Sequence, residues 1–252
     1  MKTFLVSGAG SGIGRAIANK LASEDEKVIL LGRTDAKLKQ TKDELQNPDR
    51  HPIIRADVRD KNAIGNGLKA AGLTHLDGVV ANAGVGGENI YGSRDRWDEI
   101  ISINLTGTYL LLKECLPYLK KQPERFKHII IISSILARLG IPNYSAYCAS
   151  KAGLLGLMRS LAAQYARNKI LVNAICPGWV ETDMARQGIQ AYADAVNKSY
   201  DQAFQEQMSM VPLQKMSQPE EVANLVCFLL SEEQTSFTGQ TFDINNGALM
   251  PC

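Results

Sequence analysis

The chain has 252 residues, of which 45% are hydrophobic and 21% charged, and its 28 Lys and Arg nearly balance its 26 Asp and Glu. This length fits one large α/β domain better than two small ones. A formal net charge of +2 gives no electrostatic reason to expect nucleic acid or a membrane surface as a partner.

The distribution of apolar residues, cysteines and histidines predicts a cytoplasmic protein without a metal. No apolar run approaches the ~18–20 residues that cross a bilayer, and the first one reaches Gly8 before a signal-peptide core is complete. The five cysteines are odd in number and widely spread, which indicates buried thiols in a reducing compartment. The three histidines are isolated, and no Cys or His has metal-ligand spacing, so a zinc site is not expected.

Apolar runs and helical patterns alternate along the chain. We expect strands at residues 2–7, 28–31, 52–56, 77–82, 128–134, 170–176 and 241–244. We expect helices at residues 13–23, 35–45, 61–71, 94–119, 145–166 and 219–230. Continuous apolar strands that alternate with helices indicate a parallel sheet covered on both faces. The sequence therefore predicts an α/β fold, a single doubly wound (Rossmann) domain over residues 1–252 with a mostly parallel sheet of about seven strands and ligands at their carboxyl ends.

The segment at residues 181–213 does not fit this alternation. It is long and partly amphipathic, and it is bounded by Pro177-Gly178 and Pro212. Long excursions from compact domains are usually lids or disordered segments. We interpret residues 183–213 as a helical flap over an active site, in which Tyr192, Tyr200, Phe204 and Met208 either line a pocket or pack the flap.

A glycine-rich loop joins the first strand to the first helix. It contains Gly8, Ser11, Gly12, Ile13 and Gly14. Glycines allow backbone N–H groups to approach a pyrophosphate, and the start of a helix adds the positive end of its dipole. The position of the loop after a strand and before a helix favours nucleotide binding over an ordinary tight turn.

The end of the second strand predicts the cofactor. An acidic residue there selects NAD(H), whereas an arginine accommodates the 2′-phosphate of NADP(H). This sequence has Arg33 and no carboxylate within Leu31-Gly32-Arg33-Thr34, which favours NADP(H) over NAD(H), unless Arg33 is only a solvated surface residue. Asp35 opens the next helix and is interpreted as its cap.

Tyr147 and Lys151 lie four residues apart in the expected helix 145–166, so they share one face. A positive charge within ~4–6 Å lowers the pKa of a phenol, which brings a tyrosine nearer the range of general acid–base catalysis. The alternative is a packed ring beside a solvated amine. Strand 128–134 ends in Ser133 and Ser134, of which only one should face the ligand side because strand side chains alternate.

Seven separated motifs, in order along the chain, resemble the short-chain dehydrogenase/reductase family. They are the glycine loop, Asn82-Ala83-Gly84, Asn104, Ser134, Tyr147, Lys151 and Pro177-Gly178. The resemblance covers residues 2–247. The chain departs from some family members at Ser11, where they carry a second basic residue, and this weakens the case for NADP(H) slightly.

The resemblance implies a role for each matching residue. Ser134 hydrogen-bonds the substrate oxygen, Tyr147 is the proton donor, and Lys151 lowers the pKa of Tyr147 and holds the nicotinamide ribose. Asn104 holds a water that links the lysine to solvent. The remaining cofactor contacts implied are Asp57 and Val58 to adenine, Asn82, Ala83 and Gly84 beside the ribose, and Pro177, Gly178, Val180 and Thr182 along the nicotinamide. Asp57 is alternatively a turn residue, and Thr182 alternatively caps a flap helix.

The implied activity is reduction of a ketone to a secondary alcohol by hydride transfer from NADP(H). Motifs near both ends of the flap are similar to 3-oxoacyl-acyl-carrier-protein reductases and polyketide ketoreductases, so the substrate expected is a small-molecule carbonyl or an acyl thioester. Alternatives are a dehydrogenase that oxidises a sugar, polyol or hydroxy acid, and a catalytically silent NADP-binding regulator. The family pattern also implies a homotetramer or homodimer, through helices 94–119 and 145–166. An acidic carrier protein would need basic residues near the mouth of the site. The candidates are Arg125, Lys127, Arg167 and Lys169, although we interpret them as ordinary solvated charges in preference to a binding surface.

Overall fold

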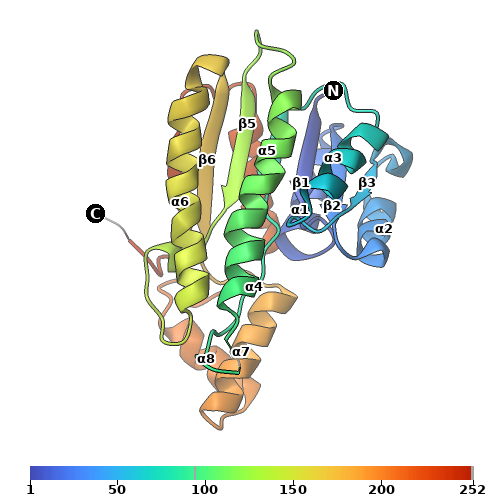
Figure 1. The fold of residues 1–252 in the computed structure, drawn as a ribbon. Helices are drawn as coiled ribbons and strands as arrows, with labels where there is room; N and C mark the ends of the chain where they lie inside the picture. Colours follow the sequence, from blue (N-terminus) through green and yellow to red (C-terminus); the bar gives the residue numbers. More distant parts are fainter. Residues whose placement is uncertain (94, 251–252) are drawn as a thin grey trace.

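The computed structural model describes residues 1–93 and 95–250. Within them, seven strands form one sheet: β1 (Thr3–Ser7), β2 (Lys27–Gly32), β3 (Ile53–Arg55), β4 (Gly78–Ala81), β5 (Lys127–Ile132), β6 (Ile170–Pro177) and β7 (Thr241–Ile244). Their order is β3-β2-β1-β4-β5-β6-β7, and every neighbouring pair is parallel (Figure 1). The order reverses between β1 and β4, so the carboxyl ends of these strands flank the place where such sheets bind ligands. The predicted doubly wound sheet is confirmed.

Helices cover both faces of the sheet. They are α1 (Gly12–Ser23), α2 (Asp35–Glu44), α3 (Lys61–Ala70), α4 (Trp97–Ile101), α5 (Gly107–Leu119), α6 (Ser145–Tyr165), α7 (Asp183–Ala195), α8 (Tyr200–Ser209) and α9 (Pro219–Leu230). Short helical turns occur at η1 (Pro48–Arg50), η2 (Ser102–Thr106), η3 (Ile135–Ala137) and η4 (Ala166–Asn168). In the described part of the chain, no helix is long and apolar enough to cross a membrane.

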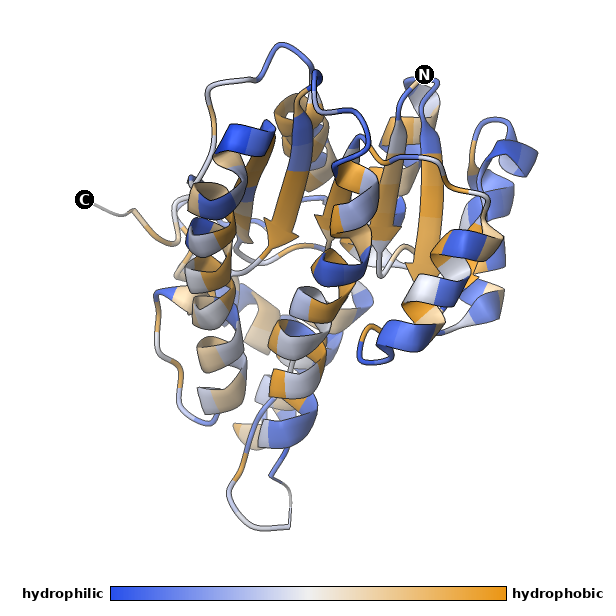
Figure 2. Cartoon of the chain, turned by 45° about the horizontal axis from the view of Figure 1, so that its top comes forward, coloured by the Kyte–Doolittle hydropathy of each residue, from blue (hydrophilic) through white to orange (hydrophobic). Residues whose placement is uncertain are grey.

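Two hydrophobic cores lie on opposite faces of the sheet. Ile129 and Ile131 of β5 pack in a core with α3, α5 and α6, whereas Ile130 and Ile132 pack in a core with α1 and α9. This division follows from the alternation of side chains along a strand. Figure 2 shows the strands as an apolar layer and the helices that cover it as a mixture of polar and apolar residues.

The predicted helix at 94–119 is interrupted, and its expected start at Arg94 lies outside the described residues. The helix α4 begins at Trp97, and the π-helical turn η2 separates it from α5. A π-turn contains one residue more than an α-turn and therefore rotates the side chains that follow it. This turn contains Asn104, whose amide is described below.

The segment 181–213 forms two helices with a small core of their own. Met208 of α8 packs with Ile189 of α7, and Tyr200 and Phe204 stack with their ring centroids 6.3 Å apart. Figure 1 places α7 and α8 beyond the carboxyl ends of the strands. Tyr192 and Met208 therefore pack the segment internally, whereas Tyr200 and Phe204 pack there and also line a surface cavity of about 680 Å³.

Candidate active site

The helix α6 places Tyr147 and Lys151 on one face, as predicted. The Lys151 ammonium lies 5.6 Å from the centroid of the Tyr147 ring and donates a hydrogen bond to the Ile132 carbonyl at 3.0 Å. This carbonyl ends β5, so Lys151 is anchored directly behind the two serines that follow the strand. Its side chain is buried, with 5% of the residue exposed.

Burial is the largest cause of the pKa shifts of this pair. Removal from water raises the pKa of Tyr147 to about 12, and the Ser134 hydroxyl offsets only part of this rise. Removal from water also lowers the pKa of Lys151 to about 8. The net pKa shift of Tyr147 is upward because desolvation of the phenol is its largest cause, and the expected effect of Lys151 on this pKa stays a prediction.

The two serines after β5 face different partners, as the strand alternation predicts. The Ser133 hydroxyl donates a hydrogen bond to the Lys151 carbonyl at 2.9 Å and so links the end of β5 to α6. The Ser134 hydroxyl accepts a hydrogen bond from Leu136 N at 3.1 Å, caps η3 and lies within reach of the Tyr147 hydroxyl.

Asn104 joins the end of β4 to the helix α6. Its amide accepts from Val85 N at 2.8 Å and donates to Val85 O at 3.0 Å and to the Ser150 hydroxyl at 3.1 Å. A Cβ on Gly84 would lie 3.2 Å from the Asn104 Oδ1 atom and 3.6 Å from the Lys151 ammonium nitrogen. The π-turn thus brings Asn104 beside Lys151, with Gly84 leaving the space between them.

The glycine loop has a shape that only glycine allows. Gly8 and Gly12 have φ values of +67° and +49°, and a Cβ on Gly14 would lie 2.2 Å from the Gly8 carbonyl oxygen. Asn82 holds the loop against β4 by donating to Ser7 O at 3.0 Å. Within the described chain, the Ser11 side chain makes no capping hydrogen bond at the start of α1. Ile13 anchors this first turn in the core, so the loop and the helix dipole fit a pyrophosphate.

The end of β2 presents Arg33 to solvent, with its side chain 57% exposed. Asp35 is the first residue of α2 and pairs with Lys39 at 2.8 Å, so the expectation that it caps the helix is wrong and Thr34 occupies the cap position. The first-turn carboxylate still favours the helix electrostatically. Val58 is buried against Gly107 in the core below this region.

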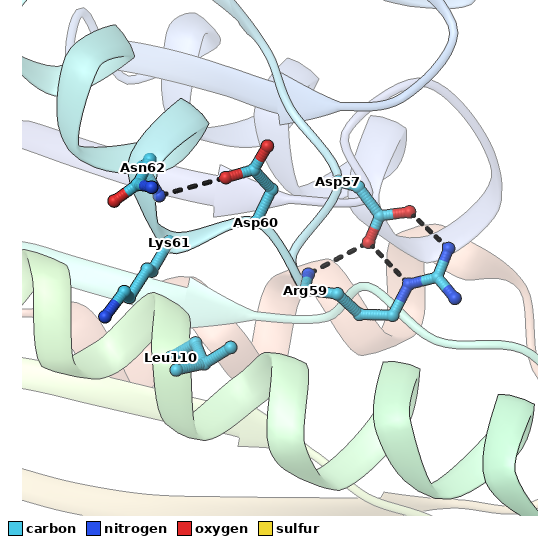
Figure 3. Close-up of a pocket in the computed structure, with 6 residues that line it drawn as sticks. All are labelled: Asp57, Arg59, Asp60, Lys61, Asn62 and Leu110. Carbon is cyan, nitrogen blue, oxygen red and sulfur yellow. Dashed lines mark hydrogen bonds and ion pairs between the residues drawn. The ribbon is translucent and has the colours of Figure 1, made fainter.

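Asp57 is held by an arginine that the sequence analysis missed. The Arg59 guanidinium grips the carboxylate through Nε at 3.0 Å and through a terminal nitrogen at 2.8 Å, and Arg59 N adds a third bond at 2.9 Å (Figure 3). A surface cavity of about 660 Å³ lies beside the pair, lined by Asp57, Arg59, Asp60, Lys61, Asn62 and Leu110. The only signal in the sequence was an arginine two residues after a strand-end aspartate.

The segment after β6 reaches back to the glycine loop. Thr182 caps α7 by accepting from Ala185 N at 3.3 Å, as its alternative interpretation predicts. A Cβ on Gly12 would lie 3.0 Å from the Thr182 methyl carbon. Val180 is buried, and Gly178 packs against Asn245. The two predicted cofactor segments are therefore neighbours in space.

The loop after β4 forms a wall beside Tyr147 that the sequence did not reveal. A Cβ on Gly86 would lie 3.2 Å from the Met184 sulfur and 3.8 Å from the Tyr147 ring. Buried Asn89 anchors this loop by donating to the Ser145 hydroxyl at 3.2 Å and to the Asn143 carbonyl. The flap residue Met184 thus meets the tyrosine across a glycine.

The expected basic rim is not at this site. Lys127 begins β5, at the opposite end from Ser134, and its fully buried ammonium pairs with Asp77 at 2.7 Å. Arg125 pairs with Glu232 at 2.7 Å, also near that end, and Arg167 and Lys169 precede β6. These four residues therefore do not form a rim near Tyr147, because strand direction places them at the amino ends of β5 and β6.

Comparison with known proteins agrees with this geometry. Residues 8–248 match a family model described as Enoyl-(Acyl carrier protein) reductase. The chain is 36% identical over 251 residues to the 3-oxoacyl-(acyl-carrier-protein) reductase FabG of Rickettsia felis, covering 99% of this chain and 97% of the relative.

Solved structures give the same result. A variant of actinorhodin polyketide ketoreductase with NADPH superposes with a TM-score of 0.90 at 31% identity, covering 98% of this chain and 97% of that one. A 3-oxoacyl-(acyl-carrier protein) reductase from Brucella melitensis with bound NAD superposes with a TM-score of 0.84 at 30% identity, covering 99% and 92%. The chain belongs to the short-chain dehydrogenase/reductase family of oxidoreductases and is a carbonyl reductase that uses a nicotinamide cofactor.

Proposed function

We propose that this protein reduces the ketone of a 3-oxoacyl thioester to a secondary alcohol with NADPH. The observation that carries the proposal is the meeting of the Ser134 hydroxyl, the Tyr147 hydroxyl and the Lys151 ammonium beside a loop shaped for a pyrophosphate. The identity to 3-oxoacyl-(acyl-carrier-protein) reductases over nearly the full chain supports the substrate class. Bound NADPH would supply the hydride that reduces the carbonyl carbon.

The residues of the chain supply the proton and stabilise charge. Tyr147 donates its proton to the carbonyl oxygen, and Ser134 donates a hydrogen bond to the same oxygen as negative charge develops. The Lys151 ammonium stabilises the phenolate that Tyr147 becomes. Asn104, through Ser150 and the Val85 main chain, holds the loop that borders Lys151 and supports the return of a proton.

We assign the cofactor to a continuous path along the carboxyl edge of the sheet. The start of α1 would hold the pyrophosphate, Arg33 would hold the 2′-phosphate, and Lys151 would hold the nicotinamide ribose. The residues assigned to this path are Gly8, Ser11, Gly12, Ile13, Gly14, Arg33, Asp57, Val58, Asn82, Ala83, Gly84, Tyr147, Lys151, Pro177, Gly178, Val180 and Thr182. The exposed guanidinium of Arg33, where NAD-selective folds have a carboxylate, supports NADP(H).

The helices α7 and α8 form the substrate flap of this proposal, since Met184 meets Gly86 and Tyr147. A homotetramer or homodimer through α5 and α6 and a cytoplasmic location complete it. Exposed Tyr109 on α5 supports such an interface, and the burial of Cys115, Cys176 and Cys227 supports a reducing compartment.

The test is NADPH oxidation on an acetoacetyl thioester with the wild type and Tyr147→Phe. Loss of the proton donor should lower kcat by about 10²–10⁴-fold while NADPH binding, measured by fluorescence, is retained. The matched control is Tyr144→Phe, because the Tyr144 ring lies edge-on to Tyr147 with centroids 6.5 Å apart. This variant should keep its activity within a few-fold.

Two results would replace the proposal. Turnover that is confined to NADP reduction on a panel of sugars, polyols and hydroxy acids would show a dehydrogenase, which runs the same proton transfer in reverse. Tight NADPH binding without turnover on any carbonyl or alcohol would show a regulator. Near-normal turnover by Tyr147→Phe would remove the assigned donor.

A further inference from the structure

We propose that Arg59 sets the preference for NADP(H) by holding the Asp57 carboxylate, so that the Arg33 guanidinium stays available to a 2′-phosphate. The proposal rests on the cofactor assignment in the proposed function. It makes Arg59 a positioning residue that acts through Asp57.

The three side chains form a row in which Asp57 lies between two arginines. Arg59 holds the carboxylate with both of its oxygens engaged, at 3.0 and 2.8 Å. Arg33 reaches the same carboxylate only at 4.0 Å, through one nitrogen. A bidentate guanidinium–carboxylate pair has better geometry than a single contact at 4.0 Å, so Asp57 is engaged chiefly by Arg59.

The summed charge of Arg33, Asp57 and Arg59 determines whether Arg33 can bind a phosphate. With Arg59 present, two guanidinium groups face one carboxylate, and a positive charge remains for an incoming phosphate. Without Arg59, Arg33 is the nearest cation to Asp57. The carboxylate would then occupy Arg33 and repel the 2′-phosphate, while NAD(H), which lacks that phosphate, would be affected little.

Neighbouring carboxylates do not take over the role of Asp57. Glu99 of α4 lies within electrostatic range of Arg33 and Arg59, but its direct partner is Arg96, at 2.7 Å. Asp60 caps α3 by accepting from Asn62 N and Ala63 N, each at 3.0 Å. The bidentate contact also holds the pKa of Asp57 below its ordinary value, so the carboxylate is ionised at neutral pH. Lys61 adds a further positive charge at the adjoining cavity (Figure 3).

Because the Arg59–Asp57 pair lies at the surface, substitutions in it can test the proposal without unfolding the protein. The Arg59 side chain is 45% exposed, and exposed ion pairs contribute little to stability. Arg59→Gln keeps a long polar side chain and removes the charge. Asp57→Asn removes the charge on which Arg59 acts, and Arg33→Ala removes the group that Arg59 keeps available.

The experiment measures the dissociation constants of NADPH and NADH by calorimetry for wild type, Arg59→Gln, Asp57→Asn, Arg33→Ala and the double variants. We expect Arg59→Gln to lower the ratio Kd(NADH)/Kd(NADPH) by about fivefold to tenfold, through weaker NADPH binding. Asp57→Asn in the Arg59→Gln background should restore the ratio, whatever its effect on both cofactors together. Arg59→Gln should change nothing further in the Arg33→Ala background.

Two further measurements separate charge from structure. Arg59→Lys keeps the charge without the planar fork and should fall between wild type and Arg59→Gln. The loss in Arg59→Gln should shrink as salt rises from about 0.05 M to about 0.5 M, because repulsion between Asp57 and the phosphate is screened.

The outcomes are distinguishable. If Arg59→Gln weakens the two cofactors equally, or if Asp57→Asn fails to restore the ratio, Arg59 does not set the preference although NADP(H) remains the cofactor. If the wild type binds NADH as tightly as NADPH, both the cofactor assignment and the role of Arg59 are wrong.

Discussion

The pKa values of Tyr147 and Lys151 suit the roles that we propose for them in carbonyl reduction at neutral pH. With a pKa of about 12, Tyr147 keeps its proton and can donate it. With a pKa of about 8, Lys151 is charged below that pH and neutral above it. The combination of a protonated phenol and a charged amine therefore exists below about pH 8 and is lost above it.

We expect kcat for ketone reduction to fall as pH rises through about 8. Neutral Lys151 no longer stabilises the charge that Tyr147 acquires when it gives up its proton, so the transition state rises in energy. The measurement is single-turnover reduction at saturating NADPH from about pH 6 to about pH 10, with circular dichroism to verify that the fold persists. A rate that stays constant to about pH 10 would contradict a role for the lysine charge.

The close contact between α1 and the loop after β1 requires glycine at position 14. A Cβ there would meet the Gly8 carbonyl oxygen at 2.2 Å, and neither backbone can move away without disturbing the turn after β1. We expect Gly14→Ala to destabilise the protein by at least about 2 kcal/mol and to abolish NADPH binding. Urea denaturation and cofactor fluorescence measure the two effects.

The matched control for this substitution is Gly156→Ala in α6. Within one described chain a Cβ at Gly156 has no atom within 4 Å, so alanine improves only helix propensity in a single subunit, and the comparison is made at a protein concentration where the subunits are monomeric. We expect it to stabilise the protein by about 0.5–1 kcal/mol. Equal effects of the two substitutions would show that helix propensity, and not the close approach to Gly8, governs this turn.

The π-turn shows which element the sequence could not predict. The helical pattern of residues 94–119 is continuous in its apolar positions, and nothing in Ser102-Ile103-Asn104 marks an extra residue. The turn is coupled to tertiary partners, since Asn104 bonds to both main-chain groups of Val85. The motif match indicated that Asn104 matters, but the direction of its amide depends on a loop 19 residues earlier.

For the whole molecule, the order of the sheet could be predicted from the sequence, but the ion-pair partners of its charged residues could not. Apolar strands joined by helices can cross over in essentially one hand, which leaves few possible sheets for this order. Asp77, the partner of Lys127, lies 50 residues earlier in the chain and is brought near it only by folding. Arg59 lies two residues after Asp57, but its bidentate geometry depends on the conformation of the turn after β3. For this reason Lys127 is neither the rim residue nor the solvated charge that the sequence suggested, and Arg59 was missed.

The amino end of the sheet should make the folded protein sensitive to acid. Burial lowers the pKa of His128 to about 4, from 6.5 for an ordinary histidine. Between these values the unfolded chain binds the proton more tightly, so stability is complete above pH 6.5 and falls as the pH is lowered toward 4.

We expect this histidine to account for up to about 3 kcal/mol of the acid-induced loss. His128→Met, which cannot titrate, should lose correspondingly less stability between pH 7 and about pH 4.5 in urea denaturation. The part that remains includes His51, whose pKa burial also lowers. If wild type and variant lose the same amount, His128 does not carry this sensitivity.

The separate small core of α7 and α8 affects how this protein can change by substitution during evolution. Ile189 and Met208 pack with each other and with neither of the two cores that hold the sheet. Substitutions within this pair of helices can therefore accumulate without repacking the strands that carry Ser134 and the helix that carries Tyr147. In the proposed function this pair is the substrate flap, so we expect substitutions in it to change the substrate while the packing around Ser134 and Tyr147 is kept.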